Sequence, residues 1–263
     1  MTHRATVWAT SSCSSRASID EAPHSWQLPP TLPQTRRTMN GGGISHALIG
    51  EIGARLGLLA KGPLAVSASP DHFLRGLLIE RTPYQHLYYV WSYLLPIFGV
   101  SGVKSLNYSR RMKNPSDGRE TFAFNGEEGV ETACAVLENA IHVNSVDFAG
   151  EYTLQRFLSE FTAEWAAVRP ALALDHAIAC CQAGNIEFGR DAIFEISRLT
   201  ARNSREHAII LVAGEMLAKL AEGSDAFVLS IRARESQFLE AEFPKVCFDR
   251  PIGKETQRSR DMS

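Results

Sequence analysis

Residues 84–98 read YQHLYYVWSYLLPIF, a run that contains four of the chain's six tyrosines. When this run is placed on a helix, its apolar side chains fill a broad arc at i, i+3, i+4 and i+7 spacing, and Gln85 and Ser92 form its polar stripe. The arc consists of Tyr84, Leu87, Tyr88, Trp91, Leu94, Leu95 and Phe98. A helix this apolar has to be covered nearly all round. The run therefore predicts a central helix in a sizeable fold.

The segments before this run also carry helical patterns. From Ser45 onward, apolar residues at helical spacing predict a first helix that ends before Gly62-Pro63. Ser69-Pro70 and Thr82-Pro83 each combine an N-cap residue with a proline suited to the first helical turn. We therefore expect a second helix to begin at Ser69 and the central helix to begin at Thr82.

One strand pattern stands out, between residues 103 and 124. Leu106 and Tyr108 alternate with polar residues before a turn cluster, NPSDG at 114–118, and a similar alternation surrounds Phe122 after it. This pattern predicts one inserted β-hairpin. The hairpin would need the helices for support, because two strands alone are marginally stable in water.

The second half of the chain is expected to be helical. The predicted helices are 125–142, 154–168, 170–183, 186–203, 204–222 and 225–243. Residues 172–199 are similar to a single tetratricopeptide unit, from which they depart at Ala173 and Ala201. Together the patterns predict a mainly α fold of about eight helices packed largely as antiparallel hairpins, with one β-hairpin near 103–124.

The chain ends differ in composition from the middle. Residues 1–43 are rich in Ser, Thr and Pro and lack a periodic apolar face, so we expect a disordered leader. Three interpretations stay open for it: a solvated tail, an organelle transit peptide, or upstream sequence translated from a misplaced start before Met39. Residues 44–243 are expected to form a single helical domain, with a possible subdomain split near 168–170. Residues 244–263 are expected to form a disordered tail.

Composition describes a soluble globular protein and excludes several classes. The formal net charge of −2 provides no general attraction to nucleic acid or to anionic membranes. Five cysteines at irregular spacing do not suggest a disulfide framework, so a reducing, cytoplasmic setting is expected. The most apolar run, residues 86–103, is short for a membrane span and is interrupted by polar residues and proline.

Motifs that would indicate a known chemistry are absent from the sequence. It contains no GxxxxGK[ST], HExxH or GxSxG, and its glycine triplet follows no predicted strand. His176 and Cys180 share a helical face, as a thiolate activated by imidazole or half of a zinc site would, but small residues at a close helix contact are the preferred explanation. The sequence does not establish whether the protein is an enzyme, although a non-enzyme is the preferred expectation, and no cofactor or metal is expected.

The favoured interpretation is a non-catalytic protein-binding module, such as an adaptor, a regulatory partner or a toxin-neutralising protein, whose partner is another protein. The candidate binding residues are Tyr88, Tyr89, Trp91, Tyr93, Arg110 and Arg111, because aromatic residues and arginine dominate interface hot spots. One alternative is an enzyme whose site is assembled from separate helices around His142, His176 or His207. Another is a nucleic-acid binder that uses the basic hairpin at Arg110, Arg111 and Lys113.

Overall fold

The structure is a computed structural model that describes residues 44–244, apart from 69, 85, 101–104, 125–128 and 149. The chain divides into two units, Met1–Asn40 and Gly41–Ser263, and all described residues belong to the second. The expectations for the leader and for residues 245–263 therefore lie outside the described residues, as does the start of the helix predicted over 125–142.

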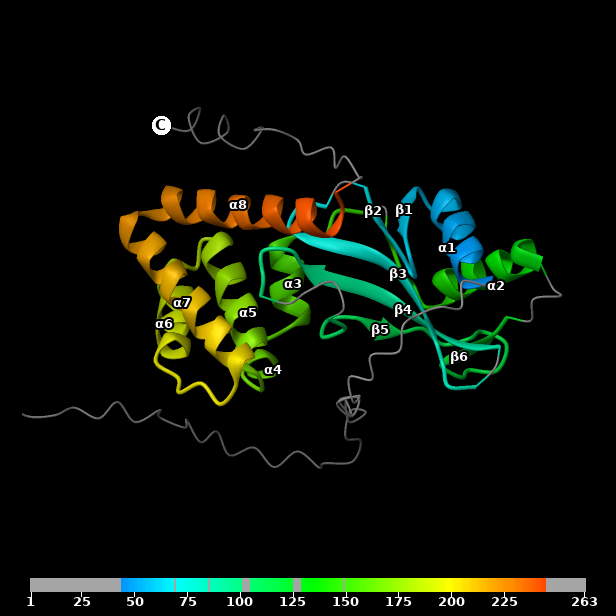
Figure 1. Cartoon of the computed structure of the whole chain (residues 1–263), viewed down its shortest axis with the longest axis horizontal. Coiled ribbons are helices and arrows are strands. Elements are labelled where there is room, and N and C mark those ends of the chain that lie inside the picture. Colours follow the sequence, from blue (N-terminus) through cyan, green and yellow to red (C-terminus); the bar gives the residue numbers. More distant parts are fainter. Residues whose placement is uncertain are drawn as a thin grey trace, which may run out of the picture. The chain divides into compact units, whose positions relative to one another are not determined.

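An antiparallel sheet forms the middle of the second unit (Figure 1). Its six strands follow the order β1-β2-β3-β4-β5, and β6 also pairs with β4. The strands are β1 (Leu58–Lys61), β2 (Leu64–Ser67), β3 (Phe73–Arg81), β4 (Leu87–Pro96), β5 (Arg110–Arg111) and β6 (Thr121–Ala123). β3 and β4 pair along their whole lengths, from Phe73 opposite Pro96 to Arg81 opposite Tyr88.

Eight helices accompany this sheet in the described part of the chain (Figure 1). They are α1 (Ile44–Arg55), α2 (Gly129–Val143), α3 (Leu154–Glu160), α4 (Ala163–Ala166), α5 (Pro170–Gln182), α6 (Ile186–Ser197), α7 (Ser204–Glu222) and α8 (Ser224–Glu242). Helices α5 to α8 form a stack in which each helix packs against the next one along the chain, and α8 runs from this stack to the sheet (Figure 1). None of the described helices is both long and apolar enough to cross a membrane.

The two faces of the sheet are covered differently. We call face A the side of the sheet that carries Arg75, Leu77 and Ile79 of β3. On β4, Ser92 is paired with Leu77 and Val90 with Ile79, and both are on the same face. Face A has two separate cores, one with α1 and α2 around Leu77, and one with α3 to α8 around Phe73. Face B carries Tyr93 and Leu95, and the end of α8 packs against it through Leu239 and Phe243.

The prediction of a mainly α, or all-α, fold was wrong. The run that we placed on a central helix is the strand β4, and the segment after Ser69 is the strand β3 rather than a second helix. The prediction of a β-hairpin near 103–124 was wrong as well, because β5 and β6 each pair with β4 and not with each other. The protein is a mixed α/β structure, in which helical packing is confined to the segments before and after the sheet.

Candidate functional site

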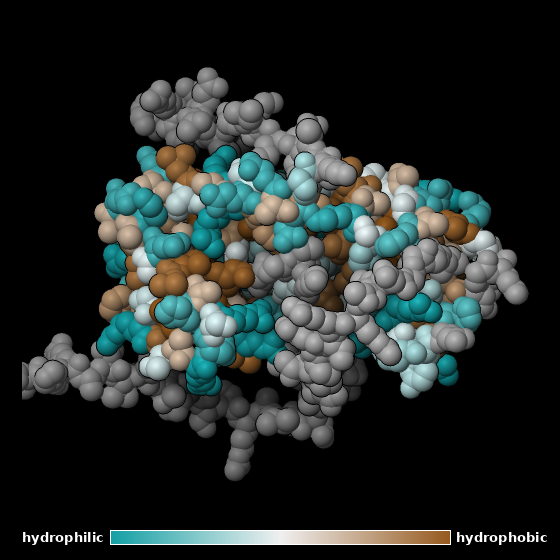
Figure 2. Space-filling view, in the orientation of Figure 1, coloured by the Kyte–Doolittle hydropathy of each residue, from teal (hydrophilic) through white to brown (hydrophobic). Residues whose placement is uncertain are grey.

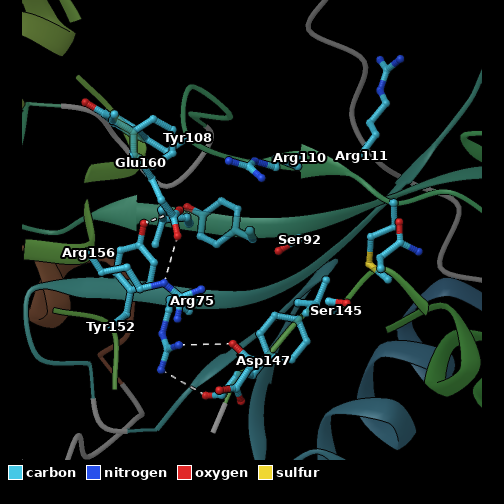
Figure 3. A pocket seen from close by; sticks show the side chains of 17 residues that line it. Arg75, Ser92, Tyr108, Arg110, Arg111, Ser145, Asp147, Tyr152, Arg156 and Glu160 are labelled. Atoms are coloured by element: carbon cyan, nitrogen blue, oxygen red, sulfur yellow. Dashed lines mark hydrogen bonds and ion pairs between the residues drawn. The ribbon is translucent and has the colours of Figure 1, made fainter. Parts of the chain in front are cut away.

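Face A is interrupted by polar side chains at the point where its two cores meet. Arg75 of β3 lies opposite Leu94, and Ser92 of β4 lies opposite Leu77, so the two polar residues are diagonal neighbours. They line a cavity of about 310 Å³ (Figure 3). Strands β4 and β5 and the segments around Asn144–Phe148 and Tyr152–Phe161 supply the remaining walls. The cavity is thus the gap between two helical layers that cover the same sheet face.

Arg75 holds the connection between α2 and α3 over the sheet. Its guanidinium donates hydrogen bonds to the carbonyl oxygens of Asp147 and Phe148, both at 3.3 Å, and to that of Gly150. An arginine has five N–H donors. Among the described residues, Nε–H and one Nη1–H of Arg75 have no protein acceptor, and no carboxylate forms an ion pair with this side chain. Burial lowers the pKa of Arg75, because removing the charged guanidinium from water costs free energy.

The Tyr152 ring lies close to two guanidinium groups. Arg156 is 4.9 Å and Arg75 is 5.7 Å from the centre of the Tyr152 ring, within the range of cation–π attraction. Glu160 accepts hydrogen bonds from the Tyr152 hydroxyl and from Arg156 Nε, both at 2.9 Å. Glu160 therefore neutralises Arg156. Arg75 faces the neutral ring and three carbonyl dipoles, and the carboxylate of Asp147 acts on its charge without forming an ion pair with it.

Tyr108 closes the cavity on the side of the helical core. Its ring packs within 5.0 to 5.4 Å of the rings of Phe157, Phe161 and Trp165. Its hydroxyl donates a hydrogen bond to Asp175 Oδ2 at 3.1 Å. Burial and neighbouring carboxylates raise the pKa of both Tyr108 and Tyr152, so both phenols are neutral at physiological pH.

The charge of the cavity is positive. Four arginines line it (Arg75, Arg110, Arg111 and Arg156), together with the acids Asp147 and Glu160. Figure 3 shows Arg110 extending over the cavity from β5 and Arg111 pointing away from it. Without Arg111, three cations and two anions leave a formal excess of one positive charge, in a small space with aromatic walls.

The candidate aromatic residues lie on β4, where Tyr88 is on face A and Tyr89, Trp91 and Tyr93 share face B. Tyr88 is buried in the core with α1 and α2, and Tyr93 is buried under the end of α8. Trp91 is also buried, and its Nε1 donates to Glu80 Oε2 at 3.1 Å. Tyr89 is half-buried. This burial leaves the four residues little surface for a partner and weakens their interpretation as an exposed anchor.

The two candidate arginines are adjacent in sequence but serve opposite faces. Arg110 contributes to the cavity, while the Arg111 guanidinium lies 4.0 Å from the Tyr89 ring centre and 4.7 Å from that of Trp91. Arg111 also forms an ion pair with Glu120 at 3.2 Å. The basic run at the expected hairpin therefore does not present one continuous cationic surface.

The side chains of His176 and Cys180 lie close together, but the thiol is not activated. His176 Nδ1 lies 3.7 Å from Cys180 Sγ. Burial raises the pKa of Cys180 to about 11 and lowers that of His176, so both groups are neutral near pH 7 and no thiolate forms. His142 and His207 are exposed on α2 and α7, and neither lines the cavity. In the described part of the chain, no group of three potential metal ligands comes together.

An apolar surface exists on the helical stack instead of on β4. The large hydrophobic side chains exposed there are Ile186, Phe188, Phe194, Leu199, Leu211, Val228 and Leu229. On the face shown in Figure 2, hydrophobic residues gather near the middle of this stack among hydrophilic ones. If a protein partner binds by apolar contact, the stack offers more accessible surface than the sheet does.

Sequence reasoning missed Arg75, Tyr108, Tyr152 and Arg156 as site residues. A signal for Arg75 was present, because it is a lone arginine inside the apolar run FLRGLLIE at 73–80. Once this run is known to be a strand, Arg75 shares a face with Leu77 and Ile79 and must enter the interior. The other three residues carry no comparable signal, because only the fold brings them to Arg75.

Comparison with models of protein families, with curated proteins and with solved structures finds no match to this chain.

Proposed function

We propose that this protein is a non-catalytic binding module whose arginine-lined cavity holds one anionic group, a carboxylate, sulfonate or phosphate. The observation that carries the proposal is the position of Arg75. It is a half-buried cation at the floor of the cavity, with two N–H donors that no described protein group accepts. An anion would supply the missing acceptor and a counter-charge, and such charge-assisted hydrogen bonds are the strong ones.

The chemistry of the lining favours binding over catalysis. Guanidinium groups stay protonated near neutral pH, and the two tyrosines of the cavity have raised pKa values. Glu160 is already engaged by Tyr152 and Arg156. The lining therefore supports recognition of a fixed charge, whereas general acid–base catalysis needs a group whose pKa is close to the working pH.

The same anionic chemistry could come from a free small molecule or from an acidic side chain of a protein partner. The expected partner remains another protein, and the exposed hydrophobic residues of the helical stack support that expectation. A reducing, cytoplasmic compartment also remains our expectation. Its support is that Cys134, Cys180 and Cys181 are buried free thiols.

Isothermal titration calorimetry tests the proposal, with benzenesulfonate and phenyl phosphate as free anions and acetyl-Gly-Glu-Gly-amide as a peptide carboxylate. We expect Arg75→Gln to weaken binding about 10- to 100-fold, the effect of losing hydrogen bonds to a charged group. Arg110→Gln, which leaves the contacts of Arg75 intact, should also weaken binding. Arg119→Gln is the matched control, because Arg119 is exposed in the turn after β5 and does not line the cavity.

The two sources of the anion give different results. Binding of the free anions alone indicates a small-molecule ligand, and binding of the peptide alone indicates a partner's side chain. If none of the three probes binds, or if Arg75→Gln and Arg119→Gln have the same effect, the proposal is wrong.

A further inference from the structure

Asp175 of α5 is buried directly behind the wall of the cavity. It has no solvent exposure, and its carboxylate accepts hydrogen bonds from the Val100 backbone N–H at 3.2 Å and from the Tyr108 hydroxyl at 3.1 Å. A side chain at Gly99 would overlap this carboxylate, so the segment after β4 is packed tightly onto it. Asp175 therefore fixes the position of Tyr108, whose ring forms the wall of the cavity.

This carboxylate has no ion-pair partner among the described residues. The charged groups that act on it are Arg205 of α7 and Arg234 of α8, which favour its ionised form from a distance. His176, its neighbour on α5, has a lowered pKa and is neutral near pH 7. Burial outweighs the two hydrogen bonds and the two arginines, and it raises the pKa of Asp175 to about 7.

We propose that Asp175 is a positioning residue for the cavity and that anion binding beside Tyr108 is coupled to uptake of a proton from solvent by its carboxylate. This inference rests on the proposed function. A bound anion places a new negative charge on the other side of the Tyr108 ring, and this charge repels that of the Asp175 carboxylate. The repulsion favours protonation of one carboxylate oxygen, which makes Asp175 neutral. Tyr108 keeps its own proton, because the pKa of its phenol is raised well above the usual value.

The sign of the pH dependence follows from this linkage. Below pH 7 Asp175 is mostly protonated before binding, so the anion meets no opposing charge. Above pH 7 part of the binding free energy is used to protonate the carboxyl, and affinity falls. Suppose that the bound anion makes Asp175 an about tenfold weaker acid. The affinity for the anion then falls by nearly tenfold above pH 8, and proton uptake reaches a maximum of about half a proton per anion near pH 7.5.

Calorimetric titration with benzenesulfonate in buffers of different ionisation enthalpy measures this uptake. Benzenesulfonate is the suitable probe because its charge is constant, whereas a phosphate monoester itself titrates near pH 6. We expect proton uptake in the wild-type protein and none in Asp175→Asn, with an affinity that no longer depends on pH. Glu235→Gln is the matched control, because Glu235 is another buried acid but lies outside the cavity, and its variant should retain the uptake.

Tyr108→Phe provides a second test that does not require Asp175 to be replaced. The hydrogen bond from Tyr108 stabilises the ionised carboxylate, so its loss should move the pH of maximum uptake upward. Uptake by a group other than Asp175 would keep its pH of maximum in this variant. Binding that depends on Arg75 but involves no proton uptake would overturn this inference and leave the proposed function standing. Absence of anion binding would overturn both.

Discussion

Replacing Phe157 with alanine should destabilise the protein by about 4 kcal/mol. Phe157 is fully buried, and its ring centre lies 4.9 Å from that of Phe73 on β3, 5.2 Å from Tyr108 and 5.2 Å from Phe161. A buried aromatic side chain removes about 150 Å² from water, which at about 25 cal/mol per Å² is worth roughly 4 kcal/mol, in agreement with the usual range for Phe→Ala. Lost ring contacts add to this loss, and partial collapse of the site reduces it.

Thermal and urea unfolding measure this effect. For a chain of this size, about 4 kcal/mol corresponds to a decrease in Tm of roughly 8 to 16 °C. Phe194→Ala is the control, because Phe194 of α6 is 48% exposed, and its loss should cost less than about 1 kcal/mol. Equal effects of the two substitutions would refute our reasoning that the aromatic cluster around Phe157 joins the helical stack to the sheet.

Two further predictions concern the sheet and the attachment of α8. A Cβ at Gly76 would overlap the carbonyl oxygen of Ala65 on β2, so Gly76→Ala should cost about 3 kcal/mol or more in chemical denaturation. Gly214→Ala, on α7 where no atom lies near, should instead stabilise by up to about 1 kcal/mol. Burial opposes the charge of His72, but the hydrogen bond from His72 Nδ1 to Glu235 at 2.7 Å and the negative charge of Glu235 outweigh it and raise the pKa of His72. The His72–Glu235 pair therefore contributes its full stability below about pH 6.5, and this contribution is lost as the pH rises through the raised pKa of His72. We expect Glu235→Gln to cost about 3 kcal/mol near pH 6 and less near pH 8.5. An unchanged difference in Tm at the two pH values would contradict this assignment.

The error on β3 and β4 has a physical explanation. The second half of β4 is buried on both faces, so it lacks the alternation of apolar and polar residues that identifies a strand. In β3, Arg75 and Leu78 are half-buried between buried neighbours, and their spacing of three imitates the period of a helix. Short apolar runs of this kind do not distinguish the two structures by periodicity alone. The aromatic residues of β4 and its flanking prolines pointed equally to a strand.

The amphipathic segments were more predictable. The two turns at Gly184 and Gly223, which have positive φ angles of 91° and 128°, separate helices close to where the sequence placed them. Helices α6, α7 and α8 are buried on one side only, so their patterns survive in the sequence, whereas α5 is buried nearly all round and was placed by its flanking Pro170 and Gly184. The cavity could not be predicted in this way, because Arg75 and Tyr152 meet only through strand pairing and the return of the chain after α2. The pattern of a single segment contains no information on such a contact.

The most direct test of anion binding at Arg75 is a ¹⁵N–¹H NMR spectrum of the arginine Nε–H groups, recorded during titration with benzenesulfonate. Our account predicts that the Arg75 signal, identified by its loss in Arg75→Gln, shifts and saturates with added anion, while the signal of Arg119 does not move. A titration in which the Arg75 signal stays in place, or in which all exposed arginines shift alike without saturation, would contradict the account.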